Sequence, residues 1–398
     1  KGYIYKYFMF VDHISYLAFQ QFFIATIVWC FSFLLLSQYL NIQHKEISNK
    51  KSFFLNYYIA LSIVAVIRIF SNILPNTPDS FMYLKASERI ANGNDFFFMG
   101  AFFYSDIIYF IKSITFDNHY AIIFLNNVLF IFALVKLLKI VPKSNLNSFW
   151  LWFLFLLAYP SIYWFVPNVL RESIFFYCIV NIFACSLDFQ NSKLRLQNIF
   201  SLVFFSIFSV LLRPQILPIL FVWYTYVFFK KSILFGLLIS LIGIIFLKND
   251  YIISEYLSKI SFEYLEAKKI EGAASIPTIA FKQTIVPNSF YELIILTPYL
   301  VFRFLFAPFP WEISNLRYSF AFLDSLILVF LFLNIAWNAI KRKLWSLDIV
   351  VFTFLFITIL GVFEIAFTGA VRHRMPYILI LSTLVMSGSK NKKIFAPR

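Results

Sequence analysis

Charge is scarce in this chain. Only 13% of its 398 residues are Asp, Glu, Lys or Arg, whereas 61% are hydrophobic and 55 are Phe, and the mean hydropathy is +0.80. Soluble domains carry about 25% charged residues, so the composition excludes one of this length. The long apolar runs match the ~20 residues of a membrane-spanning helix, whereas the strands of a membrane barrel are about 10 residues long and alternate in polarity. We therefore predict an all-α, polytopic integral membrane protein.

Residues that would form disulfides or metal sites are also few. Cys30, Cys178 and Cys185 all lie inside apolar runs and show no paired spacing, so we expect neither a disulfide nor a cysteine metal site. The 4 His residues are scattered, without metal-ligand spacing. The net charge of +15 comes from Lys and Arg in short loops between apolar runs. This distribution indicates anchoring at the cytoplasmic face and no nucleic-acid partner.

The apolar runs predict about eleven transmembrane helices in a single transmembrane domain over 1–398. They lie near 14–36, 53–74, 119–141, 148–166, 169–188, 198–212, 215–229, 232–248, 318–340, 346–368 and 375–389. Basic residues cluster in alternate loops, and such loops are cytoplasmic by the positive-inside rule. The other loops then face outward. No internal repeat supports an inverted-repeat transporter.

The outward loops include the two long ones, 75–118 and 249–317. Within the first, 101–116 is predicted to form an amphipathic helix on the outer face. Within the second, 290–309 is long enough to span the membrane. One more crossing there, however, would place the basic cluster that follows on the outer side, against the positive-inside rule. We therefore expect it to re-enter or lie in the interface, with its prolines interrupting the helix. Arg303 in this segment suits a protein-lined cavity better than lipid.

Charged residues at the outer ends of the spans are the candidates for function, because charge there is costly unless it is paired, solvated or used. The topology places six of them at one membrane face: Asp79, Arg171, Glu172, Arg213, Arg372 and Arg374.

Asp79 follows Pro78 directly after a predicted span, and Tyr83 comes one helical turn later. One interpretation is an ordinary helix cap. The other is chemical: an acid just above the membrane serves as general base toward a sugar hydroxyl, or binds a divalent metal such as Mg²⁺ or Mn²⁺ that does so.

Arg171 and Glu172 open a helix after Asn168, which is a natural cap. Glu172 in the first turn suits the positive end of the helix dipole, so capping alone explains it. Arg171 is a cation at the wrong end of a helix unless an anion lies nearby.

Two further groups of basic residues lie beside predicted helix starts. Arg213 lies at a corner between two spans. Pro376 suits the first turn of the last span, and three basic residues come directly before it: Arg372, His373 and Arg374. Arginine beside exposed helix N–H groups is suited to holding phosphate or pyrophosphate. The alternative for each arginine is contact with lipid headgroups, and His373 is either a base or polar filler.

Several short motifs occur in order along the chain: Pro78-Asp79-Ser80-x-x-Tyr83 with Arg89-Ile90-Ala91-Asn92-Gly93, Leu170-Arg171-Glu172, Leu212-Arg213-Pro214, Pro308-Phe309-Pro310-Trp311 and Arg372-x-Arg374. This series resembles the GT-C membrane glycosyltransferases, such as the protein mannosyltransferases and aminoarabinose transferases. The resemblance implies a polyprenyl-(pyro)phosphate sugar donor, a glycan or lipid-linked acceptor, and a bacterial inner-membrane enzyme working on its outer face. It also implies that Asp79 is the catalytic acid, although Ser80 replaces the second acid of the family pattern.

Two alternatives remain open. The plain bundle is also similar to O-antigen or capsule repeat-unit polymerases, which use lipid-linked sugars. From another class, a lipid-linked glycan flippase or transporter needs polar breaks through the bilayer middle, and few are present: Arg68, Asp324 and Glu364.

Overall fold

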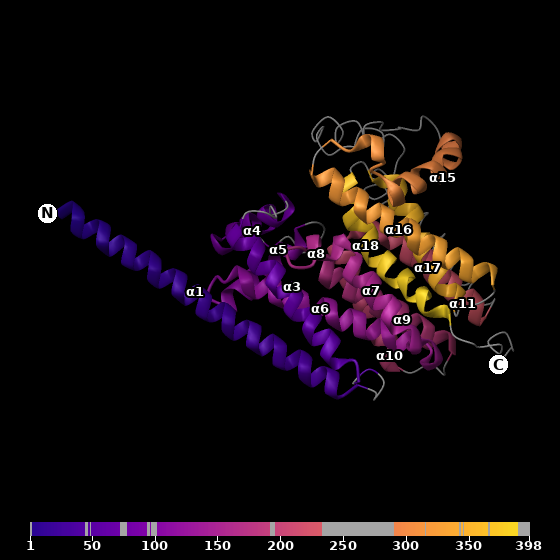
Figure 1. Cartoon of the computed structure of the whole chain (residues 1–398), viewed down its shortest axis with the longest axis horizontal. Helices are drawn as coiled ribbons and strands as arrows, with labels where there is room; N and C mark the ends of the chain where they lie inside the picture. The colour runs from indigo at the N-terminus through magenta and orange to yellow at the C-terminus, as the bar shows by residue number, and fades with distance from the viewer. Residues whose placement is uncertain are drawn as a thin grey trace. The chain divides into compact units, whose positions relative to one another are not determined.

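The fold of the chain is given by a computed structural model. It describes residues 2–43, 47, 49–71, 78–93, 96, 102–191, 196–232, 290–314, 316–341, 344, 346–364 and 367–388 (Figure 1). Every element in these ranges is an α-helix or a 3-10 helix, which confirms the all-α prediction. The span predicted near 232–248, apart from Ser232, lies outside the described residues, as does the second long loop up to residue 289.

Five helices of the described residues are long and apolar enough to cross a membrane: Gln20–Asn41, Lys51–Arg68, His119–Ile140, Glu172–Gln190 and Tyr318–Ile340. Four more apolar helices are shorter, at 10–17 residues. At 1.5 Å per residue, 17 residues cover only about 25 Å of an apolar core about 30 Å thick. The helices thus support a membrane protein, but with fewer helices of full spanning length than the eleven predicted spans.

The chain forms two compact units. The N-terminal unit comprises Lys1–Val135, Tyr163–Tyr177 and Leu211–Arg213. The C-terminal unit comprises Lys136–Ile162, Cys178–Val210 and Pro214–Arg398.

The main helices of the N-terminal unit are α1 (Gly2–Asn41), α3 (Lys51–Ser71), α4 (Pro78–Ala91), α5 (Phe103–Ile114) and most of α6 (His119–Ile140). The buried side chains of α3 recur at intervals of three and four residues, the pattern of one helix face. They include Phe54, Tyr57, Leu61, Ala65 and Arg68. The last of them puts a charge on the apolar face.

The amphipathic helix predicted at 101–116 is present as α5, which packs against α4. Its polar residues Asp106 and Lys112 are buried, whereas Phe110 and Ile114 are exposed. Lys112 pairs with Asp117 at 2.6 Å just beyond the helix. Apolar side chains of α5 thus lie on both its buried and its exposed sides, since Ile108 is buried as well.

The C-terminal unit contains η1 (Lys143–Ser148), α7 (Phe149–Ala158), the start of α8 (Pro160–Phe165), most of α9 (Glu172–Asn191) and of α10 (Leu196–Leu212), η2 (Pro214–Ile216), α11 (Leu217–Lys231), α15 (Phe290–Phe306), η3 (Pro310–Glu312), α16 (Leu316–Ile340), α17 (Leu347–Phe363), α18 (Phe367–Ser382) and η4 (Thr383–Gly388). In this unit α15 packs against α16, α17 and α18 (Figure 1). These four helices carry three of the buried charged residues described below: Arg303, Asp324 and Arg374.

Two prolines act differently from the predictions. The span predicted at 148–166 is broken into α7 and α8, because Pro160 lacks an N–H and forces Tyr159 into an extended conformation with ψ of 103°. Pro298, in contrast, does not interrupt α15, which continues through it to Phe306.

The start predicted for the last span is wrong. α18 begins at Phe367, so the basic residues Arg372–Arg374 lie inside the helix, and Pro376 lies in its middle and not in its first turn. We predicted these charged residues to lie before the helix because charge is costly inside an apolar helix. The structure accommodates them because Arg374 and His373 have polar partners in the protein.

Candidate functional site

Glu172 and Arg213 form a fully buried ion pair in the N-terminal unit. Glu172 lies in the first turn of α9, as predicted, and is the first residue of this helix; Arg213 lies at the corner where α10 ends. Arg213 Nη2 lies 2.7 Å from Glu172 Oε1, and both side chains are 0% exposed. The Arg213 guanidinium also stacks 4.5 Å from the centre of the Phe175 ring. The charge of Arg213 is therefore balanced inside the protein.

Arg171 lies directly before α9 and is buried. Its side chain is 6% exposed, and its Nη1 donates a hydrogen bond of 2.6 Å to the carbonyl of Leu212, the last residue of α10. Carbonyls at a helix end are unsatisfied and partly negative, so this contact offsets part of the charge. Among the described residues, no carboxylate forms an ion pair with Arg171. Together with the neighbouring ion pair, it leaves this corner with a net positive charge.

The capping role predicted for Asn168 is wrong. α9 begins only at Glu172, four residues later, and the side-chain oxygen of Asn168 accepts a hydrogen bond of 2.8 Å from the backbone N–H of Val169. Asn168 instead shapes the turn before Arg171, because an Asn side chain that bonds the nearby backbone stabilises a non-helical conformation.

A buried hydrogen-bond network holds this turn. Asn126 of α6 donates to the carbonyls of Asn168 at 2.9 Å and Leu170 at 3.0 Å. It also bonds to the hydroxyl of Tyr104 at 3.0 Å. Burial is the main cause that raises the pKa of Tyr104, and the charge of Glu172 adds to it, so the hydroxyl stays neutral. Tyr104 and Asn126 could not be recognised from the sequence, since neither interrupts an apolar pattern as a charge does.

Asp79 lies in the first turn of α4 and is half-buried. Tyr83, one turn later, is buried, and its ring meets the Tyr104 ring edge-on with centroids 5.4 Å apart. Since Tyr104 bonds to Asn126, packing joins the helix of Asp79 to the turn that carries Arg171. These contacts connect Tyr83, one turn beyond Asp79, to the turn that precedes Arg171.

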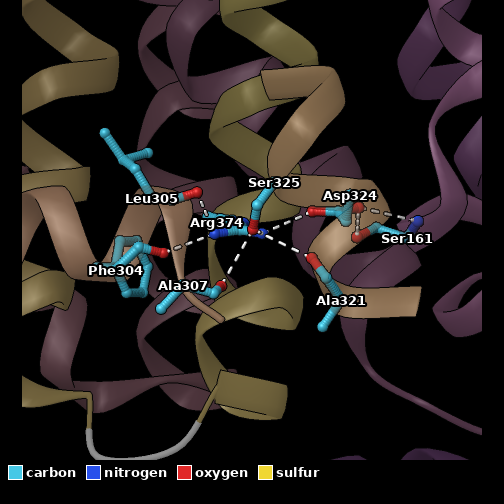
Figure 2. Close-up of polar contacts among 8 residues, drawn as sticks. All are labelled: Ser161, Phe304, Leu305, Ala307, Ala321, Asp324, Ser325 and Arg374. Atoms are coloured by element: carbon cyan, nitrogen blue, oxygen red, sulfur yellow. Dashed lines mark hydrogen bonds and ion pairs between the residues drawn. The ribbon is translucent and has the colours of Figure 1, made fainter. Parts of the chain in front are cut away.

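Arg374, in the C-terminal unit, is fully buried and surrounded by acceptors (Figure 2). Its Nη1 donates to the carbonyl of Phe304 at 2.7 Å and to that of Leu305. Its Nη2 donates to Asp324 Oδ2 at 2.8 Å and to Ser325 Oγ at 3.0 Å. A phosphate would have to displace these contacts, so the geometry indicates a structural role and not the predicted phosphate site.

Asp324 extends this cluster to a further helix. Its Oδ1 accepts hydrogen bonds from the backbone N–H of Ser161, at 3.2 Å, and from the Ser161 hydroxyl (Figure 2). Ser161 lies in the first turn of α8, whose N–H groups need acceptors after the break at Pro160. From the sequence, Asp324 was only a polar break in an apolar run. In the structure, its carboxylate joins α16 to α8 and α18.

Arg303 is likewise buried and paired. Its Nη2 lies 2.9 Å from Glu312 Oε1, and the other carboxylate oxygen accepts from the backbone N–H of Phe309 at 2.9 Å. Glu312 was not among the predicted site residues. This pair closes the turn between α15 and η3.

Glu364 and His373 form a half-buried pair where α17 gives way to α18. His373 Nδ1 lies 2.7 Å from Glu364 Oε2, and Arg372 beside it is half-buried. A Cβ atom at Gly369 would lie only 2.8 Å from the Glu364 carboxyl carbon and closer still to one of its oxygens. Glycine at this helical position therefore leaves room for the carboxylate.

Gly369→Ala should displace Glu364 from His373 and destabilise the fold by about 1–3 kcal/mol, the usual effect of overpacking. Thermal unfolding of the purified protein would measure it. If the clash is the cause, Gly369→Ala should cost much less in a Glu364→Ala background. Equal costs in both backgrounds would contradict the explanation.

Metal ligands do not gather in the described part of the chain, where no three His, Cys, Asp or Glu side chains come together. The described residues therefore give no support to the divalent metal that the sequence left open at Asp79.

The chain matches no family model, no curated protein and no solved structure. The resemblance to the GT-C glycosyltransferases therefore depends on the sequence motifs alone.

Proposed function

We propose that the protein is a membrane glycosyltransferase. It would take a sugar from a polyprenyl-(pyro)phosphate donor and transfer it to a glycan or lipid-linked acceptor at the outer face of a bacterial inner membrane. The observation that carries this proposal is Arg171, a buried cation at the start of α9 that contacts a backbone carbonyl and, within the described ranges, no acid. A guanidinium beside the N–H groups of a helix start is suited to a phosphate.

In the proposed reaction, the donor phosphate binds at Arg171 and the first turn of α9. Asp79 removes the proton of the acceptor hydroxyl, whose oxygen forms the new bond to the anomeric carbon. The bond from that carbon to the phosphate oxygen breaks, and the oxygen keeps the electron pair. Arg171 offsets this developing charge.

The other predicted site residues have orienting or structural roles in this proposal, or stay predictions. Arg213 orients the start of α9 through its pair with Glu172, and Tyr83 fixes α4 through its contact with Tyr104. The other two paired arginines, Arg303 and Arg374, bind no phosphate in this proposal. The predicted phosphate contacts of Arg372 and His373 remain predictions.

Asp79→Asn should lower sugar transfer by about 10²–10⁴-fold, the usual contribution of a general base. The measurement is transfer from a polyprenyl-phosphate sugar by the purified full chain, with donor binding as a second readout that should persist. Glu88→Gln, an exposed acid on the same helix, is the matched control and should change little.

Unchanged turnover of Asp79→Asn would defeat the assignment of the base. Products longer than one added unit would identify a repeat-unit polymerase. Absence of transfer, with passage of a lipid-linked glycan across proteoliposomes, would replace the proposal with a flippase.

A further inference from the structure

Arg68 occupies a position where the fold calls for an apolar side chain. It continues the buried face of α3, three residues after Ala65, and is only 4% exposed. It is also the last residue of the candidate span Lys51–Arg68. The guanidinium thus lies inside the protein at the end of a membrane-spanning helix.

The polar contacts of Arg68 are few. Its Nη2 donates to the carbonyl of Tyr163 at 3.2 Å. Its Nε and Nη1 are buried and have no hydrogen-bond partner within the described residues. No carboxylate of these residues pairs with it either, whereas three other buried arginines each have an acid: Arg213, Arg303 and Arg374.

A buried guanidinium without a counter-charge is unfavourable, and arginine cannot relieve the cost by losing its proton. The described part of the chain supplies no acid to Arg68, so an anionic ligand would provide a counter-charge there. At the end of a membrane-spanning helix, the common anion is the phosphate of a lipid, and basic pockets between such helices bind lipid head groups.

We propose that Arg68 binds the phosphate of a lipid at the end of α3, beside the carbonyl of Tyr163. The ring of Tyr163 packs edge-on against that of Tyr57, 6.2 Å away, about three turns before Arg68 on α3. The ligand class is a phosphate ester with a hydrocarbon chain. A membrane phospholipid and a polyprenyl phosphate both belong to it, and the site does not depend on glycosyl transfer.

Thermal unfolding of the full chain in uncharged detergent, after removal of bound lipid, tests the site. Polyprenyl phosphate or phosphatidylglycerol should raise the Tm of the wild type by several degrees, because a ligand of the folded state stabilises it. Arg68→Met should lose this response, and Arg68→Lys should keep part of it. Without lipid, Arg68→Met should be at least as stable as the wild type, because it removes a buried charge that has no acid.

Arg89→Met is the matched control, since Arg89 is exposed on α4 and its replacement changes the net charge equally. It should keep the full response. A response to both phosphate lipids supports a general lipid site, and a response to polyprenyl phosphate alone supports a site for that carrier. An equal rise with diacylglycerol or with inorganic phosphate alone would overturn the proposal. So would an unchanged response of Arg68→Met, or a lower Tm of that variant without lipid.

These measurements need no turnover. The proposed lipid site can therefore be disproved while the proposed glycosyl transfer is upheld. The reverse also holds, because loss of activity in Asp79→Asn leaves the lipid response of Arg68 unaffected.

Discussion

Arg374→Met should destabilise the C-terminal unit by about 3–5 kcal/mol, the usual result of removing one partner of a buried ion pair. The change leaves the Asp324 carboxylate buried without its cation. It also removes the donor for the carbonyls of Phe304 and Leu305 at the end of α15. Reversible unfolding in mixed micelles, followed by circular dichroism, would measure the loss.

The double variant Arg374→Met/Asp324→Asn should recover part of this loss, because it removes the stranded charge as well. Lys230→Met is the matched control: Lys230 pairs with Asp348 at 2.7 Å, but its side chain is 47% exposed. Such surface pairs contribute about 0–1 kcal/mol. If Arg374→Met cost no more than this control, the cluster in Figure 2 would have no structural role.

Arg213→Met should have a loss of similar size, about 3–5 kcal/mol, because it leaves Glu172 as a charge with 0% exposure at the start of α9. The same change removes the stacking on Phe175. The readout is again unfolding in mixed micelles, together with the yield of folded protein from membranes.

Two variants separate the causes. Phe175→Leu keeps both charges but removes the cation–π contact and part of the packing of this buried ring, and should cost roughly 1–3 kcal/mol. Glu172→Gln combined with Arg213→Met removes both charges and should be more stable than Arg213→Met alone. If the double variant were as unstable as the single one, lost packing and not the stranded carboxylate would be the cause.

Most helices could be predicted because each is one apolar run. The run at 119–141 corresponds to α6 and the run at 198–212 to α10 within two residues. The break at Tyr159 was missed because the run 148–166 is apolar throughout, although Pro160 marked the position. The early start of α18 could not be predicted, because charge is costly inside an apolar helix and therefore marks the apparent end of a span.

The candidate site could be predicted only in part. The sequence identified Arg171, Glu172 and Arg213 because charge is rare in such a chain. It could not show that Arg213 pairs with Glu172, 41 residues away, since the partner depends on how the helices pack. The burial of Arg68 could have been predicted, because its spacing from Leu61 and Ala65 places it on the same face of α3.

The hydrogen bonds from Ser161 to Asp324 also set an order of events during biosynthesis. These residues are 163 positions apart, so at about 5–20 residues per second the ribosome needs roughly ten to thirty seconds between them. During that interval the first turn of α8 has no Asp324 to accept its N–H groups, and water or the insertion machinery must serve instead. The break at Pro160 therefore creates a segment that settles late, only after the C-terminal helices have been made.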